Sequence, residues 1–340
     1  AHAWMDRAPL IVINDQYPGA TYETGMRQVL NQHALFAPIT KWQSTIHAKS
    51  VRQQIRRAIR VTTTPTPGPV QFDMPSNETM GEAVEAAGEA PLLPNVVPME
   101  PDRNALRVPL QALSNASRPI LLAGIGVFWD AASAELVKLA ERLGAPVLTT
   151  SKSKGAIPED HPLRAGCIIG GLIERELVMQ ADLIVTVGLD AIELQPKPWP
   201  YAIPVISLAN TPTLEALVPA QSEMIGNLKT MLAALAEFAP EGSGWGDSAA
   251  KSFREQVTTA LDVPTQGLSP QGAMEVARAV LPRETVATCD AGASRLLVVQ
   301  KWQSYGPRQF LTSNGLGSMG FAIPGALGAR LAYPDRPVVA

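Results

Sequence analysis

The sequence predicts an α/β protein built from consecutive domains with parallel sheets. Apolar runs of strand length alternate with amphipathic runs of helix length, which is typical of β-α-β units. Two segments, 78–101 and 241–267, lack long apolar periodicity and are expected to be linkers. A glycine-rich segment at 313–330 opens directly onto a helical run. We therefore expect three domains, at 1–80, 104–240 and 268–340.

Composition narrows the class of function. The 340 residues are 46% hydrophobic, and the net charge of −3 comes from mixed charges, so there is no electrostatic case for a nucleic-acid partner. No apolar run approaches the length of a membrane span, and no signal peptide is recognised. Cys167 and Cys289 are too far apart to suggest a metal framework or a disulfide scaffold. We expect a cytoplasmic protein without a membrane partner.

The first domain is expected to hold strands at 10–13 and 70–73 with a helix at 51–62. The opening residues are expected to end a helix that leads into a buried strand. The helix is amphipathic, and its basic side chains are expected to form a solvated face. They are Arg52, Arg56, Arg57 and Arg60.

The second domain repeats the alternation. Strands are expected at 120–123, 147–149, 183–187 and 205–208, and helices at 131–143, 173–180 and 223–238. Gly124 and Gly126 follow the first of these strands, as in a dinucleotide fingerprint, but Trp129 stands where the third glycine belongs. An NAD-linked oxidoreductase built on this turn is therefore a weak alternative.

The third domain is expected to begin with a helix at 268–281, because Ser269 and Pro270 form a helix-start pattern. A strand at 285–289 and a helix at 321–331 follow. Gly315, Gly317 and Gly320 precede that last helix, and a glycine backbone opening onto a helix lets a flat or anionic ligand approach amide groups. The other interpretation is a turn that only packs the helix closely.

Hydrolytic chemistry has little support. None of the four histidines lies at metal-ligand spacing from another or from a cysteine. No Gly-x-Ser-x-Gly nucleophile elbow occurs either.

A family resemblance covers essentially the whole chain. Residues 285–292, 313–330 and 333–340 resemble the start of the pyrophosphate-binding domain of thiamine diphosphate enzymes, as found in acetolactate synthases and related 2-oxo acid decarboxylases. Their Gly-Leu-Gly-Thr-Met-Gly-Phe-Gly-Leu-Pro run is nearly the one seen here. Earlier segments resemble, in the family's order, the pyrimidine-binding and central domains. They are residues 9–18, 37–41, 67–75, 118–126 and 154–163.

This resemblance implies thiamine diphosphate and Mg²⁺ as cofactors and a small 2-oxo acid as substrate. It implies that the carbonyl of Gly317 accepts from the aminopyrimidine and that Met319 wedges between the cofactor rings, a task that suits a flexible thioether. It also implies that Gly292 and Ser294 meet the diphosphate. Gly315 and Ser318 complete the implied cofactor-binding set.

The resemblance also bears on the substrate. Residues 25–29 match the family's Asp-Ala-Phe-Gln-Glu, so that Gln28 keeps the glutamine and Arg27 replaces a phenylalanine beside the active site. Both are implied substrate residues, and a guanidinium there suits a carboxylate, which gives the hypothesis of a substrate more acidic than pyruvate. The alternative is that Arg27 faces solvent or pairs with Glu23.

The resemblance also raises expectations about FAD, about the completeness of the chain and about the oligomeric state. Acetolactate synthases bind FAD in the central domain, but the matching residues 188–195 lack the family's arginines and aromatic residue, so FAD binding and a purely structural domain both stay open. The chain is expected to be an inactive internal fragment with incomplete first and last domains, because the activating glutamate and the magnesium segment fall outside it. Catalytic residues therefore stay unassigned. The intact protein is expected to be a homodimer or homotetramer, and the rival interpretation is a non-catalytic cofactor-binding homologue.

Overall fold

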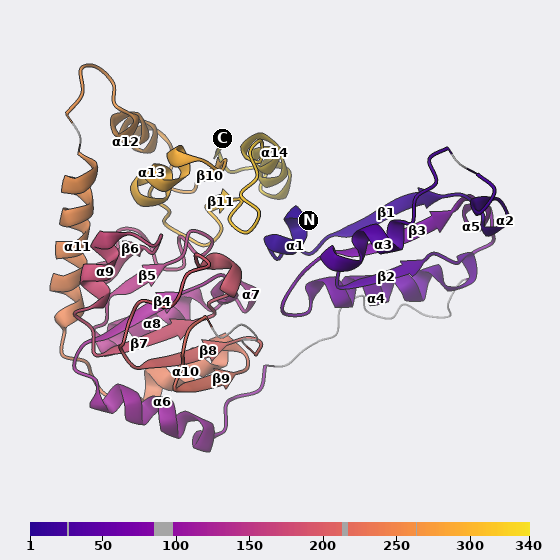
Figure 1. Cartoon of the computed structure of the whole chain (residues 1–340). Helices are drawn as coiled ribbons and strands as arrows, with labels where there is room; N and C mark the ends of the chain where they lie inside the picture. Colours follow the sequence, from indigo (N-terminus) through magenta and orange to yellow (C-terminus); the bar gives the residue numbers. More distant parts are fainter. Residues whose placement is uncertain (26, 85–97, 213–216, 263) are drawn as a thin grey trace. The chain divides into compact units, whose positions relative to one another are not determined.

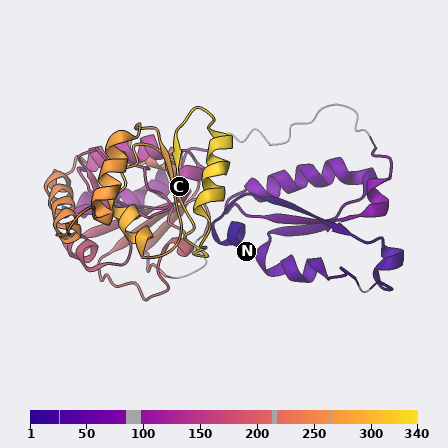
Figure 2. The same cartoon turned by 90° about the horizontal axis from the view of Figure 1, so that it is seen from above.

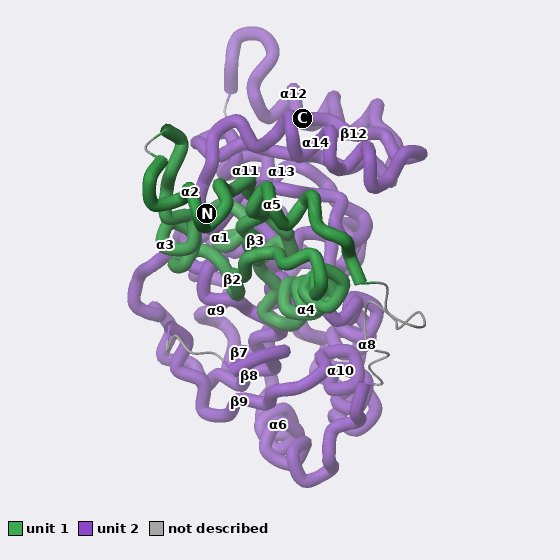
Figure 3. Tube along the Cα trace, turned by 90° about the vertical axis from the view of Figure 1, so that its right-hand side faces the viewer, with its two compact units in different colours: residues 1–97 green, residues 98–340 purple. Residues whose placement is uncertain are grey.

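A computed structural model describes residues 1–25, 27–84, 98–212, 217–262 and 264–340, and it divides the chain into compact units of residues 1–97 and 98–340 (Figure 3). Each unit is described separately. Every strand pair in the three sheets is parallel, which confirms the predicted α/β class. Residues 85–97, within the first expected linker, lie outside the described residues.

The first unit holds a three-stranded sheet in the order β1-β3-β2. Its strands are β1 (Ile11–Gln16), β2 (Trp42–Thr45) and β3 (Val70–Pro75). Helix α4 (Val51–Thr63) covers the apolar face around buried Phe72, and α3 (Gln32–Phe36) lies on the opposite face (Figure 2). The described residues of this unit also form three short α-helices, α1 (His2–Met5), α2 (Gly19–Tyr22) and α5 (Ser76–Thr79), and two 3-10 helices, η1 (Ala37–Ile39) and η2 (Ala48–Ser50).

The predicted helix at 51–62 and strand at 70–73 are confirmed. The strand predicted at 10–13 is present as β1, but the prediction that it is buried is wrong. In the described sheet β1 has only one neighbour, β3, so Ile13 stays 50% exposed.

The second unit contains a doubly wound six-stranded sheet in the order β6-β5-β4-β7-β8-β9 (Figure 1). Strand β4 (Pro119–Ala123) lies near its centre, where the strand order reverses. The other strands are β5 (Val147–Thr149), β6 (Arg164–Cys167), β7 (Leu183–Val187), β8 (Val205–Ala209) and β9 (Ser222–Ile225). The four predicted strands are confirmed, and β6 and β9 are additional.

Helices cover both faces of this sheet because alternate residues of each strand point to opposite sides. Leu121 of β4 packs with helices α6 (Arg103–Asn115), α8 (Ser133–Leu143) and α10 (Leu228–Phe238). Leu122 packs with helices α9 (Leu172–Val178) and α11 (Trp245–Leu261). Among the described helices, none combines the length and the apolar character needed to cross a membrane.

One prediction in this region is wrong, and another is right only in part. The expected linker at 241–267 contains the 17-residue helix α11, whose Ala250 and Phe253 are buried against the sheet. Its glycine-rich start is the turn before the helix, with Gly244 at φ 72°. The expected helix at 223–238 is strand β9 followed by α10, which begins where the Asn227 side chain accepts from the amide of Thr230 at 3.2 Å.

A second three-stranded sheet has the order β11-β10-β12. Its strands are β10 (Val286–Cys289), β11 (Phe310–Thr312) and β12 (Val338–Val339). Helices α12 (Pro270–Val280), α13 (Ala293–Lys301) and α14 (Ala322–Ala332) accompany it, and Ser269 caps α12 as predicted, accepting from Gly272 N at 2.9 Å. The predicted strand at 285–289 and helix at 321–331 are confirmed.

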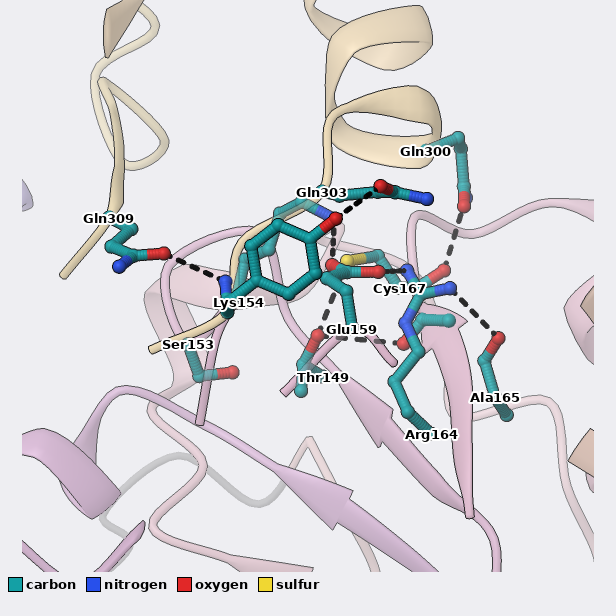
Figure 4. Close-up of polar contacts among 12 residues, drawn as sticks. Thr149, Ser153, Lys154, Glu159, Arg164, Ala165, Cys167, Gln300, Gln303 and Gln309 are labelled. Carbon is teal, nitrogen blue, oxygen red and sulfur yellow. Dashed lines mark hydrogen bonds and ion pairs between the residues drawn. The ribbon is translucent and has the colours of Figure 1, made fainter. Parts of the chain in front are cut away.

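A buried ion cluster lies beside the hydrogen bonds that join the two sheets of the second unit (Figure 4). The Glu159 carboxylate pairs with both Lys154 and Arg164, and all three side chains are largely buried. The backbone amide of Glu159 donates to the carbonyl of Ser304 at 3.2 Å. Gln300 on α13 donates from Nε2 to the carbonyl of Cys167 on β6 at 3.1 Å. These contacts fix the sheet that carries the glycine segment to the six-stranded sheet.

Candidate cofactor site

The glycine segment lies at the carboxyl edge of the sheet β11-β10-β12. Because β10 and β11 are parallel, the turns that follow them leave the same edge, where ligands of such sheets bind. The amide of Ala291 in the first turn donates to the carbonyl of Ser318 in the second at 3.4 Å. The structure therefore brings the two predicted groups together, residues 292–294 and residues 315–319.

Asp290, which no sequence motif marked as a site residue, shapes this edge. Its carboxylate accepts from the amide of Gly320 at 2.9 Å and from the amide of Ala322, at the start of α14, at 2.5 Å. These backbone hydrogen bonds hold the pKa of Asp290 below its ordinary value. Its position directly after β10 was the available signal, since parallel strands bring their following turns together.

Glycine is required at two positions by backbone conformation. Gly317 has φ 67° and Gly320 has φ 80°, values that residues with a Cβ rarely adopt. At Gly317 a Cβ would find no atom nearer than 3.9 Å, so conformation and not crowding selects glycine. Between them Met319 is 86% exposed, and Ser294 is exposed in the first turn of α13. An open edge with an exposed thioether fits the cofactor that the resemblance implies.

Asn314, immediately before Gly315, ties this segment to the six-stranded sheet. Its Nδ2 donates to the carbonyl of Ile192 at 3.2 Å, and its Oδ1 accepts from Ser151 Oγ at 3.1 Å. Arg295 donates to Asn314 Oδ1 at 3.2 Å and to the carbonyl of Ser313 at 3.1 Å. The position of the glycine segment therefore depends on the loops after β5 and β7.

The turn at Gly124 and Gly126 is filled by a side chain of the same chain. Both carboxylate oxygens of Glu193 lie 3.0 Å from the amide nitrogen of Ile125. A Cβ on Gly124 would lie 2.4 Å from Leu189 Cα, 2.5 Å from the Gly188 carbonyl oxygen and 2.6 Å from Glu193 Oε2. Glycine at this position therefore lets both the loop after β7 and the Glu193 carboxylate approach closely. Burial raises the pKa of Glu193 to about 7, against the effect of hydrogen bonds from Thr150 and backbone amides. The residues at this turn do not fit a dinucleotide.

A cavity of about 220 Å³ lies beside Glu193, between α9, the loop at 194–201 and α13. Ile168, Leu194 and Trp199 supply apolar walls, and Arg175 and Arg295 supply positive charge. This cavity lies beside the segment that matches the FAD-associated residues of the family.

In the first unit, Gln28 lines a polar chamber of about 350 Å³ at the carboxyl ends of β1 and β3, together with Asp15, Tyr17 and Tyr22. Arg27 is exposed and is not part of that lining. Helix α2 ends at Tyr22, neither Glu23 nor Arg27 belongs to a described helix, and Gln28 has φ 60°. Met26 lies outside the described residues.

No metal site is apparent within the described ranges, where no group of three or more His, Cys, Asp or Glu side chains is placed to hold an ion. Asp290 lies near the glycine segment, but two backbone amides already engage its carboxylate. The magnesium ligands that the resemblance implies stay a prediction.

Comparisons with known proteins agree with the site. The central-domain model of thiamine pyrophosphate enzymes matches residues 107–235, and the model of their C-terminal cofactor-binding domain matches residues 290–340. Together the two models match more than half of the chain.

The chain is 28% identical to a probable acetolactate synthase large subunit of Methanocaldococcus jannaschii and 28% identical to the acetolactate synthase isozyme 1 large subunit of Escherichia coli, and each match covers 100% of this chain. A probable 2-ketoarginine decarboxylase, AruI, of Pseudomonas aeruginosa is 29% identical over 98% of this chain. The chain spans 61% of the length of each of these relatives. This chain belongs to the thiamine diphosphate-dependent, acetolactate synthase-like enzyme family.

Proposed function

We propose that the intact protein uses thiamine diphosphate and Mg²⁺ to decarboxylate a 2-oxo acid and to join the product to a second carbonyl compound, as acetolactate synthases do. The observation that carries the proposal is the glycine segment folded over Asp290, with Met319 exposed at the sheet edge. Bound thiamine diphosphate supplies the electron sink for the decarboxylation. The rival function is a non-catalytic homologue that keeps the fold.

The chain's own residues bind and orient the cofactor. Gly292 and Ser294, at the start of α13, are proposed to contact the diphosphate, and Gly315, Gly317 and Ser318 to contact the pyrimidine. Met319 is proposed to lie between the two rings. Because Asp290 fixes both ends of the turn at 320–322, this edge is organised without the cofactor, which reduces the ordering cost of binding.

The substrate is proposed to enter the chamber lined by Gln28. Relatives named as acetolactate synthases and as a 2-ketoarginine decarboxylase support 2-oxo acid chemistry but differ in the side chain beyond the oxo group. The acidic-substrate idea for Arg27 stays a hypothesis, beside the alternative that Arg27 faces solvent. The hypothesis requires the exposed guanidinium to turn toward the chamber.

A homodimer or homotetramer is proposed because α14 and the preceding turn present an exposed apolar stripe with a spacing of four residues, one helical turn. It consists of Met319 (86% exposed), Ile323 (70%), Leu327 (63%) and Leu331 (84%). A second subunit's pyrimidine-binding domain would cover this stripe and complete the cofactor site. A monomer of the full-length protein in sedimentation velocity at working concentration would contradict this proposal. The two free, buried cysteines suit a reducing, cytoplasmic location.

Calorimetric titration of the full-length protein with thiamine diphosphate tests the function. We expect thiamine diphosphate to bind only when Mg²⁺ is present. In a separate activity assay we expect the protein to release CO₂ from a 2-oxo acid. The non-catalytic rival predicts no magnesium-dependent binding. The 340-residue chain assayed alone is expected to be inactive, since it spans 61% of its relatives. Magnesium-independent binding or no binding in the full-length protein would overturn the proposal.

A further inference from the structure

The central domain carries its own anion where related proteins hold a dinucleotide. We propose that Glu193 takes the place of a dinucleotide phosphate in this protein, so that the central domain binds no flavin, and that Glu193 positions the segment that binds thiamine diphosphate. The second half of this proposal rests on the proposed function. The first half stands without it.

The carboxylate is held by donors from three separate loops. After β4 the amide of Ile125 donates at 3.0 Å, after β5 the hydroxyl of Thr150 donates, and after β7 the amide of Asp190 donates at 2.9 Å. These loops leave the carboxyl edge of the sheet at β4, where the strand order reverses, which is the place where such sheets bind phosphate groups. The Glu193 side chain thus uses the donors that a phosphate would need.

A phosphate cannot share this position. A group seated on the Ile125 amide would overlap the Glu193 oxygens, and its negative charge would meet the carboxylate in a buried environment with little screening. Asp190, in the same loop, adds a second carboxylate near the site and contributes to the raised pKa of Glu193. Arg175 and Arg295 also line the adjoining cavity, but the hydrogen bonds of Glu193 come from Ile125, Thr150 and Asp190.

Glu193 also determines where Asn314 is held. The turn that it closes, residues 190–193, includes the Ile192 carbonyl that accepts from Asn314 Nδ2 at 3.2 Å. The strand end that it holds through Thr150 continues into Ser151, which donates to Asn314 Oδ1 at 3.1 Å. The Glu193 carboxylate therefore holds the two loops that supply the Ile192 and Ser151 contacts of Asn314. Asn314 in turn precedes Gly315 of the cofactor segment.

The test uses the full-length protein and two alanine variants. Glu193→Ala removes the internal anion, and Glu176→Ala, on the exposed side of α9, is the matched control. For Glu193→Ala we expect the dissociation constant of thiamine diphosphate to rise about tenfold or more. We also expect acetate or inorganic phosphate to raise the melting temperature of this variant alone and to recover part of the affinity, because a small anion can fill the vacated position. The control is expected to match the wild type.

Flavin binding is tested separately. The wild type, incubated with FAD and freed of excess ligand, is expected to show no flavin absorbance near 450 nm, and a stoichiometric flavin band would overturn the first half of the proposal. Equal thiamine diphosphate affinities for the two alanine variants would overturn the second half. Should Glu193→Ala fail to fold, Glu193→Gln, which keeps the size and removes the charge, gives the same comparison. If no form binds thiamine diphosphate, the proposed function fails, while the flavin and anion-dependent melting measurements still decide about Glu193.

Discussion

Loss of the Glu159 carboxylate is expected to destabilise the second unit, because this carboxylate pairs with two largely buried cations. It is the only carboxylate in the cluster with Lys154 and Arg164, and the Lys154 side chain is fully buried. Glu159→Gln keeps the shape but leaves the Lys154 ammonium without an opposite charge. Breaking a buried ion pair from one side costs about 3–5 kcal/mol, because the desolvated partner stays uncompensated. We expect that loss of unfolding free energy, or a fall of roughly 6–20 °C in Tm for a unit of this size.

Urea unfolding followed by circular dichroism measures this change. The matched control is Glu275→Gln, which breaks the ion pair between Glu275 and Lys301 (2.8 Å), where the carboxylate is exposed. Exposed pairs contribute about 0–1 kcal/mol, so the control should unfold almost as the wild type does. A loss below about 1 kcal/mol for Glu159→Gln, similar to the control, would show that water reaches Lys154 and would refute the reasoning.

Four further outcomes are expected. Gly317→Ala should destabilise by about 1–2 kcal/mol, because a Cβ is strained at φ 67°, whereas Gly328→Ala, inside α14 with open space around it, should stabilise by up to about 1 kcal/mol; equal effects in thermal unfolding would contradict this. The ionised Asp290 carboxylate should stabilise the wild type above about pH 4, and this stabilisation should be lost as the pH falls through the lowered pKa of Asp290. Asp290→Asn lacks the stabilisation at every pH, so the pH-stability curves of the two proteins should differ in slope below about pH 4. For Glu193 the pH dependence of stability has the opposite direction, because burial raises its pKa from 4.5 to about 7. The wild type should therefore lose unfolding free energy as the pH rises from 4.5 to about 7, and Glu193→Gln should show a smaller loss over this range. Parallel pH-stability curves for the two proteins would contradict the buried position of the Glu193 carboxylate. Arg27→Phe should leave the ratio of kcat/KM for pyruvate and a dicarboxylic 2-oxo acid unchanged, since Arg27 lies outside the chamber lining, and a shift toward pyruvate of about tenfold, or about 1.4 kcal/mol, would instead support the acidic-substrate hypothesis.

The sequence alone determined the fold class and most of the elements that carry the site. Strands such as β4 and β7 are short, continuous apolar runs because helices cover both of their faces. Such runs can be recognised in the sequence without a structure. The glycine segment was legible as well, because a positive φ at Gly317 and Gly320 can be met at low cost only by glycine. Helix α11 was missed because its glycine-rich start resembles a linker, although Gly246, Ala250 and Phe253 have helical spacing.

Only the tertiary structure decided which residues meet. Asp290 and Gly320 are separated by 30 positions, and Glu193 and Ile125 by 68, so no local pattern links either pair. A parallel sheet brings the ends of its strands to one edge whatever the length of chain between them, and this places a carboxylate of one loop on the amides of another. The sequence pattern at Gly124 and Gly126 indicated a possible phosphate site. In the folded protein the carboxylate of Glu193 occupies this turn instead. The sequence could not show this, because the raised pKa and the filled turn both result from burial among loops that are distant along the chain.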